Sequence, residues 1–71
     1  MIYREDGWVA EVEVLSKEQE NGGCKTILKV IKTIRESPYI KLEALPKDGE
    51  IFSVWKADGA GFYGGWTLDA Y

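Results

Sequence analysis

Side chains that commonly carry out catalysis or bind metals are scarce in this chain. It contains no histidine, and Cys24 is its one cysteine. Histidine is the usual general base, the usual activator of a serine or cysteine nucleophile and a common zinc ligand, so these arrangements are missing. A lone cysteine cannot form an internal disulfide, which suits a reducing compartment. The sequence therefore predicts a protein that is not an enzyme and that has no metal ion or cofactor.

Two short patterns imitate functional motifs. Glu11 and Glu13 share one face of a predicted strand, as an acid–base pair would, but nothing in the sequence supplies a partner, and we expect both to be exposed to solvent. Residues 59–64 spell G-x-G-x-x-G, yet a dinucleotide site also needs a following helix and an acidic residue about 20 positions further on. Because only seven residues follow Gly64, we interpret this stretch as a turn followed by small strand residues.

The charge pattern disfavours nucleic acids and membranes as partners. The net charge is −3, whereas binding to a phosphate backbone depends on a surplus of lysine and arginine. No apolar run approaches the ~18 residues needed to cross a bilayer, and residues 1–6 do not resemble a signal peptide. We expect a cytoplasmic protein. A stretch of basic residues is expected to form a solvated face that is paired with acidic residues. The basic residues are Lys25, Lys29, Lys32 and Arg35. Their acidic partners are Glu11, Glu13 and Glu18.

Local patterns predict a single domain, residues 1–71, with hairpin turns. Residues 21–23 and 58–61 contain Asn-Gly and Asp-Gly, which are strong short signals for such turns. In residues 8–16, apolar side chains at positions 8, 10, 12 and 14 alternate with others that include Glu11 and Glu13. This alternation predicts a half-buried strand.

Residues 24–36 allow two interpretations. Their apolar side chains fall on one side of a helical wheel, which favours an amphipathic helix. Many of them are β-branched, which favours a strand. Pairing with the preceding strand supports the second interpretation, since it matches apolar with apolar residues and acidic with basic ones. We therefore expect residues 26–34 to be extended and antiparallel to residues 9–15.

Two pairing registers fit this hairpin. A two-residue turn at Asn21–Gly22 would place Glu11 opposite Lys32, Leu15 opposite Leu28, Val12 opposite Ile31 and Val9 opposite Ile34. A longer turn with a glycine bulge would instead place Glu13 opposite Lys29, Val14 opposite Leu28, Val12 opposite Val30 and Trp8 opposite Ile34. A bulge partway along the hairpin would explain why both faces of residues 24–36 carry apolar side chains.

The remaining segments complete a mainly β fold. Residues 39–45 predict a brief strand or an irregular crossing, residues 51–56 a strand, and residues 62–68 its hairpin partner. Four or five short strands are typical of a small antiparallel barrel-like domain of SH3-like or OB-like shape. If residues 24–36 were helical, the fold would be α+β, with one helix on an antiparallel sheet.

Aromatic side chains near the C-terminus are the most suggestive functional feature. We expect Phe62 and Trp66 in the core, and Trp55, Tyr63 and Tyr71 at the surface of an aromatic C-terminal hairpin. The leading hypothesis is a small non-enzymatic protein-binding or accessory module whose partner contacts these three side chains. The alternatives are a structural homo-oligomer that buries its surplus aromatics between subunits, and a low-affinity nucleic-acid binder.

Overall fold

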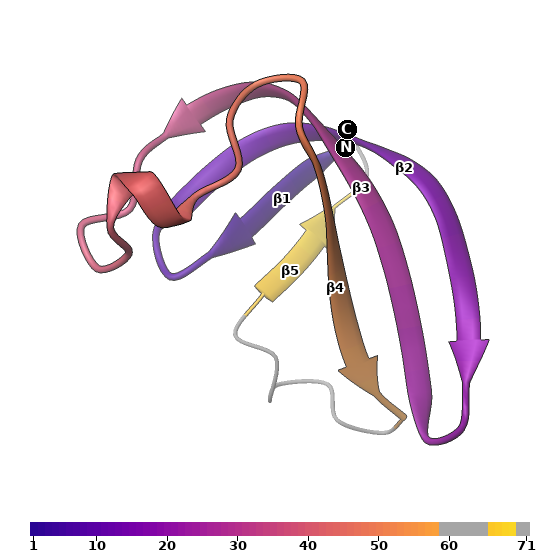
Figure 1. Ribbon diagram of the computed structural model, residues 1–71. Coiled ribbons are helices and arrows are strands. Elements are labelled where there is room, and N and C mark those ends of the chain that lie inside the picture. The colour runs from indigo at the N-terminus through magenta and orange to yellow at the C-terminus, as the bar shows by residue number, and fades with distance from the viewer. Residues whose placement is uncertain (59–65, 70–71) are drawn as a thin grey trace.

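The computed structural model describes residues 1–58 and 66–69. All of its strands pair antiparallel in one five-stranded sheet of order β4-β3-β2-β1-β5 (Figure 1). The mainly β fold with four or five antiparallel strands is therefore confirmed. The elements in chain order are β1 (Ile2–Glu5), β2 (Trp8–Glu20), β3 (Gly23–Arg35), the short 3-10 helix η1 (Leu42–Ala44), β4 (Ile51–Ala57) and β5 (Trp66–Asp69).

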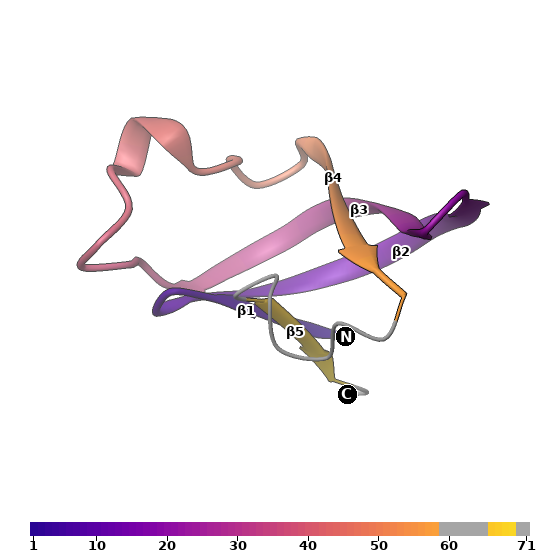
Figure 2. The same cartoon turned by 90° about the horizontal axis from the view of Figure 1, so that it is seen from below.

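The sheet curls without closing into a barrel. β4 and β5 are its end strands and, within the described residues, do not pair with each other. Figure 2 shows β4 lying across the core from β1 and β5. The predicted hairpin between residues 51–56 and 62–68 is wrong for the described part of the second strand, because Trp66–Asp69 pairs with β1. β1, which has β5 as its second neighbour, was not among the predicted strands. Residues 62–65 lie outside the described residues.

The β2–β3 hairpin dominates the sheet and confirms the extended interpretation of residues 24–36, so the helical alternative is wrong. Glu20 lies opposite Gly23, which leaves Asn21–Gly22 as a two-residue turn. Gly22 has φ +87°, the left-handed conformation that such turns favour and that glycine adopts without strain.

The hairpin combines the two predicted registers. Glu13 lies opposite Lys29, as the bulged register requires, whereas Glu11 lies opposite Lys32, as the simple turn requires. One register shift, between Glu11 and Val12, separates these two pairs, and a bulge partway along the hairpin was expected to produce such a change of register. The individual pairs expected for Leu15 with Leu28, Val12 with Ile31, and Val9 or Trp8 with Ile34 are wrong.

Three residues are left over at these register shifts, and all three are large apolar side chains. Leu15 on β2 and Ile31 and Ile34 on β3 have no partner in the β2–β3 register, and all three are exposed. An extra residue on one strand bends that strand and increases its twist. The bulges therefore bend the long hairpin over the core and leave these apolar side chains at the surface.

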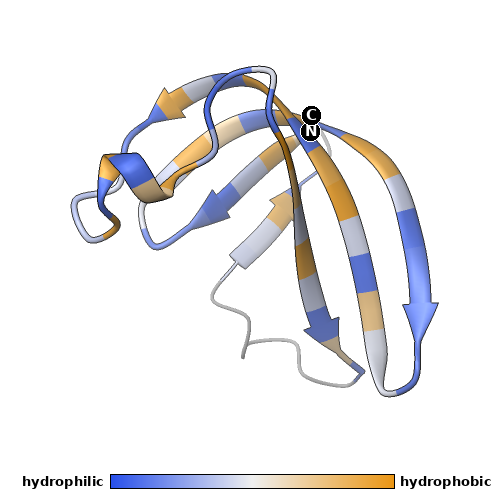
Figure 3. Ribbon diagram, viewed as in Figure 1, coloured by the Kyte–Doolittle hydropathy of each residue, from blue (hydrophilic) through white to orange (hydrophobic). Residues whose placement is uncertain are grey.

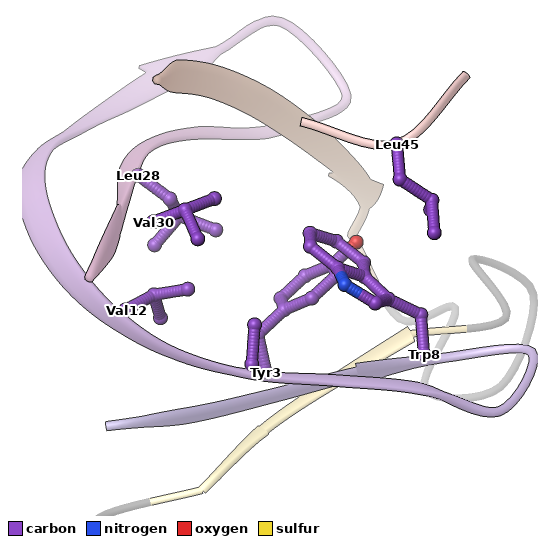
Figure 4. Packing of buried hydrophobic residues seen from close by; sticks show 7 residues of the cluster. Tyr3, Trp8, Val12, Leu28, Val30 and Leu45 are labelled. Carbon is purple, nitrogen blue, oxygen red and sulfur yellow. The ribbon is translucent and has the colours of Figure 1, made fainter. Parts of the chain in front are cut away.

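The core lies on the inner side of the curled sheet. Figure 3 shows apolar residues along the half of β2 and β3 remote from the Asn21–Gly22 turn, while β2 ends in polar residues. The predicted alternation of β2 is confirmed, since Trp8, Ala10 and Val12 are buried. The full set of buried hydrophobic residues is Tyr3, Trp8, Ala10, Val12, Leu28, Val30 and Leu45 (Figure 4).

Tyr3 is the centre of an aromatic cluster that joins four strands. Its side chain is 0% exposed. Its ring meets that of Trp8 edge-on at 5.3 Å, meets Phe52 edge-on at 5.2 Å and stacks on Trp66 at 5.7 Å between centroids. Phe52 and Trp66 come from the two end strands. Trp66 is partly buried against the core, as predicted from the sequence, and the Lys56 ammonium lies 5.2 Å from its ring centroid.

The connection between β3 and β4 is an irregular crossing, one of the two forms predicted for residues 39–45. The Ser37 hydroxyl donates to the Asp6 carbonyl at 2.5 Å and accepts from the Tyr39 and Ile40 N–H groups, each at 3.0 Å. Further along, the Asp48 carboxylate accepts from the Thr33 N–H at 3.0 Å. These bonds hold the connection against the β1–β2 turn and against β3, and Leu45 thereby packs against the core.

Trp66 and Trp55 offer a matched pair for testing the location of the core. Trp66→Ala removes the ring stacked on Tyr3 and should lower the free energy of unfolding by about 3–5 kcal/mol, as aromatic truncations in cores do. Trp55 is 49% exposed, and Trp55→Ala should cost roughly 1 kcal/mol. Urea denaturation of both variants measures the difference. Equal losses, or a larger loss for Trp55→Ala, would contradict the assignment of the core.

The Tyr3 hydroxyl should make stability depend on alkaline pH. Burial, the hydrogen bond donated to the Glu5 carboxylate and the negative charges of Glu5 and Asp6 raise the pKa of Tyr3 well above its ordinary value. Above the ordinary tyrosine pKa of about 10, the unfolded chain releases this proton while the folded chain retains it. Stability is therefore fully present below that pH and falls as the pH rises above it.

The measurement is urea denaturation between pH 8 and pH 11. Tyr3→Phe should lower stability at neutral pH by about 1–2 kcal/mol, because the bond to Glu5 is lost. It should also flatten the alkaline decline. Tyr39 is 83% exposed, so Tyr39→Phe is the control and should follow the unmodified protein. An alkaline decline that is unchanged in Tyr3→Phe would refute this role of Tyr3.

Candidate functional site

Trp55, the one described member of the predicted partner-binding set, lies on the outer face of end strand β4. β4 alternates between partly buried Phe52 and Val54, which pack against the core, and exposed Ile51, Ser53 and Trp55. Trp55 is 49% and Ile51 is 62% exposed. The strand thus presents two large apolar side chains outward with a small serine between them. Tyr63 and Tyr71, the other two predicted binding residues, lie outside the described residues.

A glycine on the neighbouring strand positions the Trp55 ring. Gly23 lies diagonally from Trp55 in the β3–β4 register, where Lys25 is directly opposite. A Cβ atom built on Gly23 would lie 2.4 Å from Trp55 Cζ2 and 2.6 Å from the Lys56 carbonyl oxygen, both well inside van der Waals contact. The absence of a side chain at Gly23 therefore lets the indole ring lie close against the backbone of β3.

The backbone of β4 leaves a set of hydrogen-bonding groups directed away from β3. Asp58 donates to the Gly22 carbonyl at 2.9 Å, and Val30 donates to the Glu50 carbonyl at 2.9 Å. Between these bonds the β3–β4 register is unbroken, and hydrogen-bonded pairs alternate along an antiparallel ladder. Even-numbered residues of β4 therefore bond to β3. The outward N–H and C=O groups belong to the odd-numbered residues Ile51, Ser53, Trp55 and Ala57.

No strand among the described residues pairs with this outer side of β4. An unpaired strand edge is a ready template for another strand, and proteins usually blunt such edges with charges, proline or bulges. β4 has the sequence IFSVWKA and its register with β3 is regular. Lys56 is its single charged residue, and that side chain lies over Trp66. The candidate functional site is therefore the β4 edge, defined as the outward backbone groups of β4 together with the side chains of Ile51, Ser53 and Trp55.

Residues of opposite charge occupy facing strand positions on the outer face beside the β4 edge. In the register, Lys25 lies between Trp55 and Glu18, and Lys29 lies between Ile51 and Glu13. The lysines predicted to form a solvated face thus stand opposite the predicted acidic residues. Glu13 is exposed and Glu11 is partly exposed. Among residues 1–58 and 66–69, the side chains of Glu11 and Glu13 form no ion pair.

Two small pockets adjoin the Trp8 ring beneath the β3–β4 connection. One encloses about 260 Å³ and reaches Thr33 and Leu42, and the other encloses about 240 Å³ and reaches Tyr3 and Phe52. Trp8, Leu45 and Pro46 line both. The Trp8 Nε1–H is buried and finds no acceptor among the described residues. The first pocket is lined mainly by apolar groups, and its Asp48 carboxylate is already bonded to Thr33. The second pocket is lined by polar and apolar groups alike, and its Glu5 carboxylate accepts the hydrogen bond from the Tyr3 hydroxyl.

The described residues contain no group of three or more histidine, cysteine, aspartate or glutamate side chains placed to hold a metal ion. Cys24 is a free, partly buried thiol. None of the helices in residues 1–58 and 66–69 has the length and apolar character needed to cross a membrane.

Of the side chains at the β4 edge, only Trp55 was predicted from the sequence as a binding residue. Ile51 and Ser53 appeared only as members of a strand, and Gly23 only as part of a turn. Alternation in residues 51–56 could have assigned Ile51 and Ser53 to the same face as Trp55. The open edge itself could not be inferred, because it depends on β5 pairing with β1.

No protein-family model matches the sequence, and no curated protein and no solved structure matches it either.

Gly23→Ala tests how the Trp55 ring is held. The new methyl group would overlap the indole and the Lys56 carbonyl, and we expect a loss of about 1–3 kcal/mol in unfolding free energy, as overpacking costs. In a double-mutant cycle, Trp55→Ala should remove part of this cost, because the nearest overlapping atom is gone. Gly23→Ala and Trp55→Ala effects that simply add would contradict the contact. Thermal or urea denaturation of the three variants supplies the measurement.

Proposed function

We propose that this chain is a small non-enzymatic protein-binding module that takes an extended protein segment along the β4 edge. The observation that carries the proposal is the row of outward N–H and C=O groups on Ile51, Ser53, Trp55 and Ala57, which no described strand pairs. Addition of a strand to an open edge satisfies such groups directly.

The side chains of the β4 edge supply the second part of this recognition mode. In strand addition, main-chain hydrogen bonds give affinity and the alternate side chains give specificity. Trp55 and Ile51 are exposed on the same face, and tryptophan is among the residues that most often dominate binding energy at protein interfaces. The Trp55 ring moreover lies close against Gly23, so a bound segment would meet an aromatic side chain that already packs on the domain.

Other classes of function have less support. The lysines nearest the β4 edge stand opposite glutamates, and the net charge is −3, which disfavours a phosphate backbone as the partner. The chain has no histidine and one thiol. These residues offer few groups for catalysis, and a single thiol suits the reducing cytoplasm.

Ser53→Pro tests the use of the backbone. Proline removes the N–H group of Ser53, which points away from β3, and proline is tolerated on edge strands at such positions. The probe is a library of random peptides displayed on phage and selected on the immobilised domain. We expect selected peptides to bind Ser53→Ala as well as the unmodified domain, and to bind Ser53→Pro at least tenfold more weakly.

A second variant separates loss of binding from loss of folding. Trp55→Lys leaves the backbone groups in place but adds a charge to the edge, and it should also weaken the same peptides. Circular dichroism confirms that each variant is folded. Selected peptides that bind Ser53→Pro and Trp55→Lys with undiminished affinity would show that the β4 edge is not the binding site.

A further inference from the structure

We infer that the segment bound along the β4 edge is β4 of a second copy of this chain, so that two sheets join across a two-fold axis. This inference rests on the proposed use of the β4 edge. It follows from the sequence of the strand, which is complementary to itself in one antiparallel register.

The backbone fixes that register. In an antiparallel pair related by a two-fold axis, full overlap of residues 51–57 requires the axis to pass beside Val54. The outward groups belong to odd-numbered residues, and in this register odd residues meet odd residues. Ile51 meets Ala57 of the second copy, and Ser53 meets its Trp55. All outward N–H and C=O groups of both strands can then be hydrogen-bonded. An axis beside Trp55 or Ser53 would confine the pairing to residues 53–57 or 51–55.

The side chains agree with the same register. On the outer face, the large Trp55 lies opposite the small Ser53 of the second copy, and Ile51 lies opposite Ala57. On the inner face Val54 lies opposite its own copy, as a β-branched pair that suits a sheet. Large residues thus meet small ones on the outer face, and the pairing needs no change in the backbone of β4.

The charge of the strand also permits the pairing. Lys56 is the single charged residue of β4. With the axis at Val54, it lies opposite Phe52 of the second copy rather than opposite its own copy. Like charges directly opposite each other destabilise a sheet, so this register avoids the one repulsion that the strand could produce.

A second copy is favoured over an unrelated segment because the interface closes. A two-fold interface uses the same surface on both subunits and leaves none of it free. A regular, mostly uncharged edge would otherwise continue to recruit strands and aggregate. Association also stabilises a small domain by mass action, and a 71-residue domain buries too little surface to be more than marginally stable alone.

Disulfide trapping tests the register. In a Cys24→Ser background, Val54→Cys would place two thiols at a non-hydrogen-bonded pair, where Cα atoms lie about 4.5 Å apart, within the range that a disulfide spans. Ile51→Cys is the matched control on the same strand, since its two copies would lie about 20 Å apart at ~3.3 Å per residue. We expect mild oxidation to convert Val54→Cys, but not Ile51→Cys, to a covalent dimer.

Sedimentation equilibrium of the unmodified chain over a hundredfold concentration range provides the second readout. The mass should rise from 8.0 kDa to twice that value. Ser53→Pro should remain a monomer, and Ser53→Ala should dimerise like the unmodified chain. A chain that stays monomeric throughout would overturn the self-pairing, while Ser53→Pro-sensitive peptide binding would leave the proposed function standing. A dimer that survives Ser53→Pro, or that traps Ile51→Cys in preference to Val54→Cys, would show that the interface lies elsewhere.

Discussion

The burial of the Tyr3 ring is the interaction on which the rest of the structure depends. Tyr3 touches Trp8 on β2, Phe52 on β4 and Trp66 on β5. The last two strands stand at opposite ends of the sheet order, so a flat sheet could not bring both to one ring. The sheet must curl, and the bulges of the β2–β3 hairpin supply the bend. Aromatic contacts thereby connect β4 with β5 through the core, although the described residues of these two strands do not pair with each other.

This solution has a consequence for the surface. Because the ends of the sheet meet through side chains, one side of the β4 backbone pairs with no strand in the part of the chain that the structure describes. The bulges likewise leave Leu15, Ile31 and Ile34 on the outer face. A small domain has too few residues to bury all of its apolar side chains, and here the surplus lies on the outer face of the sheet, some of it beside an open edge. The features that close the core therefore also create the surface that we propose for binding.

Sequence patterns predicted the segments that are governed by local rules. The alternation from Trp8 to Val14 and the acid–base matches of the β2–β3 hairpin led to the correct strands and to a bulge between two registers. Long-range pairing was beyond such rules. Residues 2–5 form a short strand whose importance comes from Tyr3 and from contacts far along the chain. The Asp6-Gly7 pair, with positive φ at both residues, is a local signal for the turn that joins this strand to β2, but it does not reveal that β5 is the second neighbour of β1. The hairpin predicted for residues 51–56 and 62–68 failed for the same reason, because a turn signal cannot reveal that β1 is the partner of β5.

The candidate site was partly accessible to the same reasoning. Trp55 was predicted because aromatic side chains are concentrated near the C-terminus of the chain. The outward backbone groups of β4 were not accessible, because which side of a strand is free depends on the order of the whole sheet. Tyr63 and Tyr71 remain predictions.

Amide hydrogen exchange along β4, followed by NMR at low and high protein concentration, tests the central claim most directly. At low concentration the amides of Phe52, Val54 and Lys56 should be protected by their bonds to β3, while those of Ile51, Ser53 and Trp55 should exchange rapidly. At high concentration the second group should become protected as well. An absence of alternation at low concentration, or odd-numbered amides that remain unprotected at every concentration, would contradict an open β4 edge that pairs with its own copy.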